Sequence, residues 1–204
     1  MTTLASARDQ VLARVRRALP AAAPASAIPR DYRARAEDDI ETFIQRLGDY
    51  GATTQRVSSG ELGTAVPATL RDDGIRRLVV PDGIPKAWLH GAEPLHDTPP
   101  LDHHTLDHAD GVITTCAIAI AQTGTIVLDA GGGMGRRTLS LIPDYHLCVV
   151  HADQVVGSVP EALAALDPTR PLTLFSGPSA TVDIEMVRVQ GVHGPRRLHV
   201  IVVG

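Results

Sequence analysis

The chain has 204 residues, of which 44% are hydrophobic and 21% are charged, a composition typical of one ordinary globular domain. Its 19 basic and 23 acidic side chains give a formal net charge of -4, and 3% of the residues are aromatic. This balance offers no general attraction to a phosphate backbone and little surface for base stacking, so nucleic-acid binding is not expected. Charged residues interrupt the apolar runs well before the ~20 residues that a membrane span requires. We therefore expect no membrane span.

Lysine and cysteine usage exclude several cofactor sites. The single lysine, Lys86, lies between Pro85 and Ala87, so the Gly-Lys-Ser/Thr sequence of a phosphate-binding loop is missing. The two cysteines, Cys116 and Cys148, occupy separate apolar stretches, whereas a thiolate cluster needs about four ligands. We expect two buried free thiols in a reducing compartment and no cofactor bound by this chain.

The first 29 residues are predicted to form a helix followed by a connector. Val11, Leu12 and Val15 share one helical face between residues 4 and 19, and residues 20–29 are rich in Ala and Pro without an internal charge. This helix is interpreted either as an arm or as a helix packed on the same domain. The Pro-broken Ala stretch after the arginines does not fit a secretory signal, so a cytoplasmic protein is expected. Residues 30–204 are predicted to form one domain.

Helical and strand-like segments alternate through the first half of that domain. Apolar residues recur at helical spacing over residues 36–50, and β-branched residues indicate a strand at 53–57. A weaker helix over 60–71 and a short strand at 78–80 follow. This alternation favours an α/β domain with a largely parallel sheet flanked by helices.

Residues 94–110 are polar and are predicted to form a loop. His104 and His108 could share a helical face there and bind a metal, but a solvated loop explains the same residues.

The second half of the chain is strongly apolar. Residues 117–121 and 125–128 are joined through Gln122-Thr123-Gly124 and are predicted to form a hairpin. Further predicted strands lie at 111–114, 139–142, 147–150, 172–175 and 198–203, with a helix at about 160–166.

Three Gly-rich turns follow apolar strands and are candidates for one site, because open α/β sheets bind ligands beyond the carboxyl ends of their strands. Thr123-Gly124-Thr125 offers two hydroxyls and a backbone that a ligand can approach, or is simply a hairpin turn. Residues 131–135 are predicted to leave backbone amides uncovered, with Arg136 or Arg137 binding a carboxylate or phosphate; a surface loop is the alternative.

The third turn is Ser176-Gly177-Pro178-Ser179. It is predicted to lead into the N-terminus of a helix, where amides could bind an anion and where Asp183 or Glu185 could instead cap the first turn. His193, beside Gly194, is a candidate acid–base or hydrogen-bonding group, or a residue that only stabilises its turn.

The motifs of the second half, taken in order, resemble the lactate utilization protein C family, the LUD-domain proteins. The resemblance rests on the run Ala121–Thr125, on Arg136 with Leu141-Ile142-Pro143, on Ser176–Ser179 followed by Asp183, and on residues 191–195. It covers the chain from about Gly111 to the C-terminus, and the first 100 residues match in general layout.

This resemblance implies a fold similar to CoA transferases and sugar-phosphate isomerases. It also implies a role in oxidising L-lactate to pyruvate together with two iron–sulfur partner proteins, which carry the clusters that this chain lacks. The predicted ligand-binding residues, for a small anionic ligand, are Thr123, Gly124, Thr125, Arg136, Ser176, Gly177, Pro178, Ser179, Asp183, His193 and Gly194. No catalytic residue is assigned.

Two positions depart from the family pattern. Gln122 replaces a glutamate that is usual in the family, and Ala180 replaces a basic residue. These departures favour a non-catalytic subunit that binds an anion or a partner. A small enzyme of the CoA-transferase or sugar-phosphate-isomerase type is the alternative, although its covalent glutamate would have to be Glu161 or Glu185. A scaffold that docks through its N-terminal helix is a third interpretation.

Overall fold

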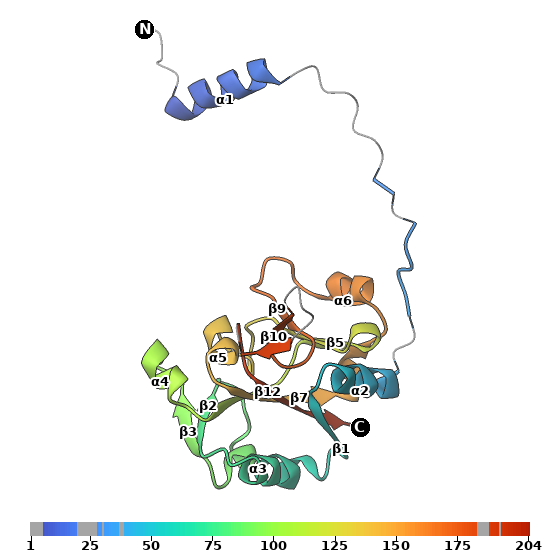
Figure 1. Cartoon of the computed structure of the whole chain (residues 1–204), viewed down its shortest axis with the longest axis vertical. Helices are drawn as coiled ribbons and strands as arrows, with labels where there is room; N and C mark the ends of the chain where they lie inside the picture. Colours follow the sequence, from blue (N-terminus) through green and yellow to red (C-terminus); the bar gives the residue numbers. More distant parts are fainter. Residues whose placement is uncertain (1–5, 20–27, 30, 37–38, 183–187, 192) are drawn as a thin grey trace. The chain divides into compact units, whose positions relative to one another are not determined.

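The computed structural model describes residues 6–19, 28–29, 31–36, 39–182, 188–191 and 193–204 (Figure 1). The chain divides into two units, residues 1–32 and 33–204. The first unit contains helix α1 (Ala7–Ala18), which begins where the Ser6 hydroxyl accepts a hydrogen bond from the Asp9 amide. Its apolar side chains Val11 and Val15 are exposed. Among the described residues, no helix combines the length and apolar character needed to cross a membrane.

The second unit is built on a six-stranded sheet in which every neighbouring pair is parallel, with the order β1-β12-β7-β4-β2-β3. Such a sheet is covered on both faces, and its two central strands, β4 and β7, are accordingly buried at every residue except His151 at the end of β7. The strands are β1 (Thr53–Val57), β2 (Arg77–Val80), β3 (Glu93–His96), β4 (Gly111–Thr114), β7 (Tyr145–His151) and β12 (Arg197–Val203).

Helices and a second sheet cover the two faces of this sheet (Figure 1). On one face, Val66 and Leu70 of α3 (Leu62–Asp72) pack with Leu147 and with η1 (Lys86–Leu89). On the other face, α2 (Ile40–Asp49) packs Phe43 and Leu47 with Cys148 and Val200. Near β2 and β4, the short helices α4 (His103–Asp107) and α5 (Arg137–Leu141) complete the core. The prediction of a parallel α/β sheet flanked by helices is confirmed.

The second sheet has four strands in the order β8-β5-β6-β9. Strands β5 (Ile118–Ile120) and β6 (Thr125–Leu128) pair antiparallel around η2 (Ala121–Thr123), so the predicted hairpin is confirmed. Strand β9 (Thr173–Phe175) runs antiparallel to β6, and helix α6 (Val159–Ala165) packs on this sheet. The remaining elements are η3 (Ala152–Gln154), β8 (Val155–Val156), β10 (Ala180–Val182) and β11 (Arg188–Gln190).

Three local predictions were wrong. Residues 139–142 belong to helix α5 and its end rather than to a strand, because so short a segment, Leu-Ser-Leu-Ile, fits either periodicity. The segment after Ser179 begins with strand β10, paired with β11, rather than with a helix. Its β-branched residues Thr181 and Val182 favour a strand. The loop predicted at 94–110 contains most of β3 and all of α4.

Candidate functional site

The first and third Gly-rich turns meet in the fold. Because β9 runs antiparallel to β6, the end of β9 lies beside the start of β6. Thr125 Oγ1 is 2.7 Å from Ser176 Oγ and 2.7 Å from Thr123 Oγ1, which makes a short chain of hydroxyls. Gly124 lies against α2, where a Cβ would be 2.7 Å from the Arg46 Cβ. This contact holds the turn on the core.

The second Gly-rich turn lies at the other end of β6, so the three turns do not form one site. Its amides are also largely occupied: Gly131 donates to Asp129, Gly133 donates to the Asp82 carbonyl, and Gly135 donates to the Gly131 carbonyl. The Gly133 carbonyl in turn accepts from the Thr115 amide. The prediction of uncovered amides at 131–135 was wrong, because the turn uses them to join the ends of β2 and β4.

Arg136 is held by a carboxylate of its own chain. Its Nε and Nη2 donate to the two oxygens of Asp97 at 2.8 and 2.9 Å, Nη2 also donates to the Leu101 carbonyl, and Nη1 donates to Thr138 Oγ1. This pairing lowers the pKa of Asp97 and raises the pKa of Arg136. These hydrogen bonds connect Arg136, at the start of α5, to the loop at residues 97–101 that precedes α4.

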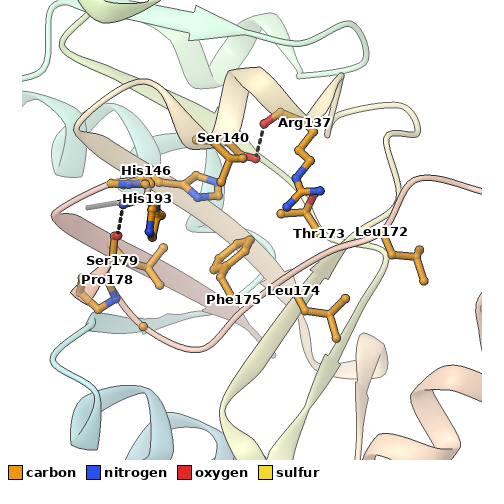
Figure 2. A pocket seen from close by; sticks show the side chains of 15 residues that line it. Arg137, Ser140, His146, Leu172, Thr173, Leu174, Phe175, Pro178, Ser179 and His193 are labelled. Atoms are coloured by element: carbon orange, nitrogen blue, oxygen red, sulfur yellow. Dashed lines mark hydrogen bonds between the residues drawn. The ribbon is translucent and has the colours of Figure 1, made fainter. Parts of the chain in front are cut away.

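A cavity of about 240 Å³ lies between α5, β9 and the segment around Ser179; we call it the α5–β9 pocket. Figure 2 shows its polar side chains together with Phe175, whose ring centroid is 5.0 Å from that of His146. The pocket is lined by Arg137, Ser140, Leu141, His146, Leu172, Thr173, Leu174, Phe175, Gly177, Pro178, Ser179, His193, Gly194, Pro195 and Leu198.

Arg137 supplies the positive charge of this pocket. Its side chain is exposed and extends from α5 toward β9 (Figure 2). Within the part of the chain that the structure describes, its guanidinium makes no hydrogen bond or ion pair. An unpaired guanidinium presents a planar fork of donors that fits a carboxylate or a phosphate. Arg137 therefore has free guanidinium donors at this pocket, whereas those of Arg136 are bound to Asp97, Leu101 and Thr138.

His146 forms part of the pocket wall from within strand β7. It is 1% exposed, and its Nε2 lies 2.7 Å from Thr114 Oγ1. Complete burial lowers the pKa of His146 to about 3, since a charged imidazole is poorly solvated there. The ring is therefore neutral at physiological pH, and with Nε2 engaged by Thr114, Nδ1 is the nitrogen available to a ligand.

Ser179 and His193 face the pocket from a tightly bonded turn. The His193 amide donates to Ser179 Oγ at 3.1 Å (Figure 2). The Ser179 amide donates to the Pro195 carbonyl at 2.7 Å. The Ser179 carbonyl accepts from the Gly191 amide. These bonds hold the Ser179 hydroxyl and the exposed His193 imidazole beside one another, so they could share a polar group of a ligand.

The structure brings five of the predicted site residues to the pocket: Gly177, Pro178, Ser179, His193 and Gly194. Thr123, Thr125 and Ser176 form the chain of hydroxyls and are not among the lining residues, and Asp183 lies outside the described residues. Gln122, one of the two departures from the family pattern, is exposed and is not part of the pocket lining.

The residues missed by sequence reasoning are Ser140, His146 and Phe175. One signal could have revealed His146, since it is a polar residue within the apolar run from Tyr145 to Val150. Ser140 was hidden by the incorrect strand at 139–142.

The described residues contain no group of three or more His, Cys, Asp or Glu side chains arranged to hold a metal ion. His104 and His108 stack with their ring centroids 4.1 Å apart on α4, and His108 Nδ1 lies 2.9 Å from the His104 carbonyl oxygen. Both cysteines are buried free thiols, as expected, and burial raises the pKa of Cys148 to about 12.

The parallel sheet, the mixed second sheet and the flanking helices make an α/β domain, and a family model described as LUD domain matches residues 102–203 of it. A Lactate utilization protein C of Deinococcus radiodurans is 49% identical over 215 residues, covering 100% of both chains. A Lactate utilization protein C of Shouchella clausii is 30% identical over 168 residues, covering 73% of this chain and 72% of the relative.

A solved structure agrees with these relatives. The crystal structure of a DUF162 family protein from Deinococcus radiodurans superposes with a TM-score of 0.67 at 46% identity, covering 81% of this chain and 96% of that chain. The chain belongs to the LUD domain family, and the predicted resemblance is confirmed.

Proposed function

We propose that this protein is a component of an L-lactate utilisation system, in which L-lactate is oxidised to pyruvate in the cytoplasm. The observation that carries the proposal is the 49% identity, over the whole of both chains, to a protein named Lactate utilization protein C. Oxidation of lactate releases two electrons. In this proposal, two iron–sulfur partner proteins accept those electrons, and this chain acts as a subunit that does not itself carry them.

The role proposed for this chain is to bind an anionic ligand in the α5–β9 pocket. Arg137 would bind the anionic group, and Ser179, His193 and Nδ1 of His146 would bind neutral oxygens of the ligand. Phe175 and Leu174 supply apolar surface beside these groups. Since no described side chain of the pocket is a carboxylate, covalent catalysis through an acyl-glutamate is not supported there.

The test is growth of a clean deletion strain on L-lactate as sole carbon source, with growth on glucose as the control. We expect loss of growth on L-lactate alone, restored by the wild-type gene. Normal growth of the deletion strain on L-lactate, in a strain with no second lactate route, contradicts the proposal. It would favour a small enzyme acting on an acyl-CoA or a phosphosugar.

Complementation with point variants tests the pocket. Arg137→Gln removes the unpaired positive charge and is expected to slow growth on L-lactate severalfold without loss of soluble protein. Arg76→Gln changes the same charge on an exposed arginine outside the pocket and serves as the matched control. Equal growth of the two variants would show that the anion is not bound by Arg137.

A further inference from the structure

A second, smaller cavity of about 110 Å³ lies at the amino ends of β1, β7 and β12. Its polar lining consists of Thr53, Asp73, Tyr145, Arg196, Arg197 and His199. Tyr145 and His199 alternate with His146 and Leu198 along their strands, so their side chains point to the other face of the sheet from His146. The cavity is therefore separate from the α5–β9 pocket.

An aspartate and a histidine are paired in this cavity. Asp73 follows the last residue of α3, and its Oδ2 accepts a hydrogen bond from Tyr145 Oη at 2.6 Å and lies 2.9 Å from His199 Nδ1. Burial and the nearby Asp73 raise the pKa of Tyr145, so the phenol keeps its proton and donates it. Because an ionised carboxylate only accepts, Nδ1 of His199 donates the hydrogen bond to Asp73, and in the neutral tautomer with its proton on Nδ1 the other nitrogen, Nε2, has a lone pair.

That lone pair has no partner within the described chain. The His199 side chain is 12% exposed. Among the buried side-chain nitrogen and oxygen atoms of the described residues, Nε2 of His199 is the one that has no hydrogen-bond partner. Buried acceptors are rarely left unpaired, because the lost hydration is not recovered. The arrangement is the one in which a carboxylate orients an imidazole so that its other nitrogen faces a ligand. A donor from outside the chain would complete it.

An arginine with free donors borders the same cavity. Arg197 Nη1 donates to the Asp73 carbonyl at 3.3 Å, and its guanidinium lies 4.9 Å above the Tyr145 ring centroid. Its Nε and Nη2 have no partner within the described chain. Arg196, by contrast, is held by both oxygens of Asp144. Thr53 is the register neighbour of His199 on β1 and adds a hydroxyl.

We propose that this cavity binds a small 2-hydroxycarboxylate, whose hydroxyl donates to Nε2 of His199 and whose carboxylate is bound by Arg197. The two groups that need partners, an acceptor and a guanidinium, match the two functional groups that such a molecule carries on adjacent carbons. The proposal is one of binding, and no bond is made or broken. It rests on the proposed function only in the choice of L-lactate as the ligand to be tested first.

Nuclear magnetic resonance of the imidazole nitrogens tests the site directly. The full chain is labelled with ¹⁵N, the His199 signals are assigned by their loss in His199→Gln, and L-lactate, pyruvate and inorganic phosphate are titrated separately. We expect a saturable shift of the His199 Nε2 signal with L-lactate. Pyruvate, which lacks the hydroxyl donor, is expected to bind roughly tenfold more weakly or worse, since the acceptor stays unpaired.

Variants of the arginine test the carboxylate contact. Arg197→Gln is expected to weaken L-lactate binding roughly tenfold, the loss of one charge-assisted contact, while Arg76→Gln leaves it unchanged. Because Arg197 also packs over Tyr145, Arg197→Lys is made in parallel. It keeps a cation near the ring but removes the two-donor fork, and it should also weaken binding. Full L-lactate affinity in a folded Arg197→Gln or Arg197→Lys variant overturns the proposal.

The anion titrations separate this site from a phosphate site. The polar and charged groups facing His199 are Asp73 from the end of α3, Tyr145 from β7, and Arg196 and Arg197 at the start of β12, with Asp144 paired to Arg196. A preference for phosphate over L-lactate, or no response of His199, overturns the proposal. A growth phenotype of the deletion strain is independent of both outcomes.

Discussion

Arg136, which was predicted to bind a ligand, forms hydrogen bonds within the chain through its guanidinium donors. Both of its partners on the preceding loop, Asp97 and the Leu101 carbonyl, lie more than 30 residues earlier in the chain. We expect Arg136→Ala to lower the free energy of unfolding at pH 7 by about 1–2 kcal/mol, a value reduced for the partial exposure of Arg136. Denaturant unfolding measures the loss, and a variant as stable as wild type would contradict it.

The same pair predicts a pH effect. Arg136 lowers the folded-state pKa of Asp97. The contribution of this ion pair to the free energy of unfolding is therefore complete above the unfolded pKa of about 4, and it is lost as the pH falls through the folded-state pKa. The difference in stability between wild type and Arg136→Ala should therefore shrink below pH 4. A difference that stays constant down to pH 2.5 would show that the loss comes from packing rather than from the ion pair.

His146 gives a separate pH dependence at higher pH. Its folded pKa of about 3 lies below the usual value near 6.5, so unfolding takes up a proton between these values. The contribution of His146 to stability is complete above pH 6.5 and is lost as the pH falls, by about 1.4 kcal/mol for each pH unit. We expect His146→Gln, which can keep a bond to Thr114, to flatten the decline between pH 6 and 4 in urea unfolding.

At the scale of elements, the Gly131–Gly135 turn joins β2 and β4 through bonds to Asp82 and Thr115. Gly133 has a φ of +76°, and a Cβ there would lie 2.5 Å from Thr115 Oγ1. Gly133→Ala is therefore expected to lower the free energy of unfolding by about 1–3 kcal/mol.

Gly132→Ala in the same turn is the matched control, because a Cβ there meets no atom within 4 Å. We expect it to change the stability by less than about 0.5 kcal/mol. Equal losses in the two variants, measured by thermal unfolding, would indicate that the turn responds to added side chains in general.

Elements with a strong local pattern could be predicted from the sequence, and contacts between distant segments could not. The hairpin at Gln122–Gly124 and the buried strand at 198–203 follow from their turn residues and β-branched runs. The direction of β9 relative to β6, which brings Ser176 to Thr125, depends on pairing across 51 residues. Five of the fifteen residues that line the pocket were accordingly predicted, from the motifs at 176–179 and 193–194, while Ser140 comes from a helix whose packing no local signal reveals.

At the scale of the whole molecule, the segment at residues 33–36 belongs to the second unit through contacts with the start of α6. Ser158 Oγ donates to the Ala34 carbonyl at 2.9 Å, and the Ala36 amide donates to Glu161 Oε2 at 3.3 Å. A protein of residues 33–204 keeps both contacts and should unfold within a few degrees of the full chain.

A protein of residues 37–204 provides the comparison. It loses both contacts and uncovers Ser158, which is 1% exposed, so its unfolding midpoint should fall by several degrees, as ~1 kcal/mol does in a domain of this size. Calorimetry of the two proteins measures the difference. Identical midpoints would mean that residues 33–36 add nothing to the domain.

The place of β12 in the sheet has a consequence for synthesis. This strand is the last element along the chain, yet it lies between β1 and β7 and is paired over its whole length with β7. On the ribosome, β1 is made early but cannot join its neighbour until residues 197–203 have emerged. The nascent chain must wait with two open strand edges, the state in which parallel sheets are most exposed to aggregation. We therefore expect nascent chains that end before residue 197 to aggregate more readily than the complete domain.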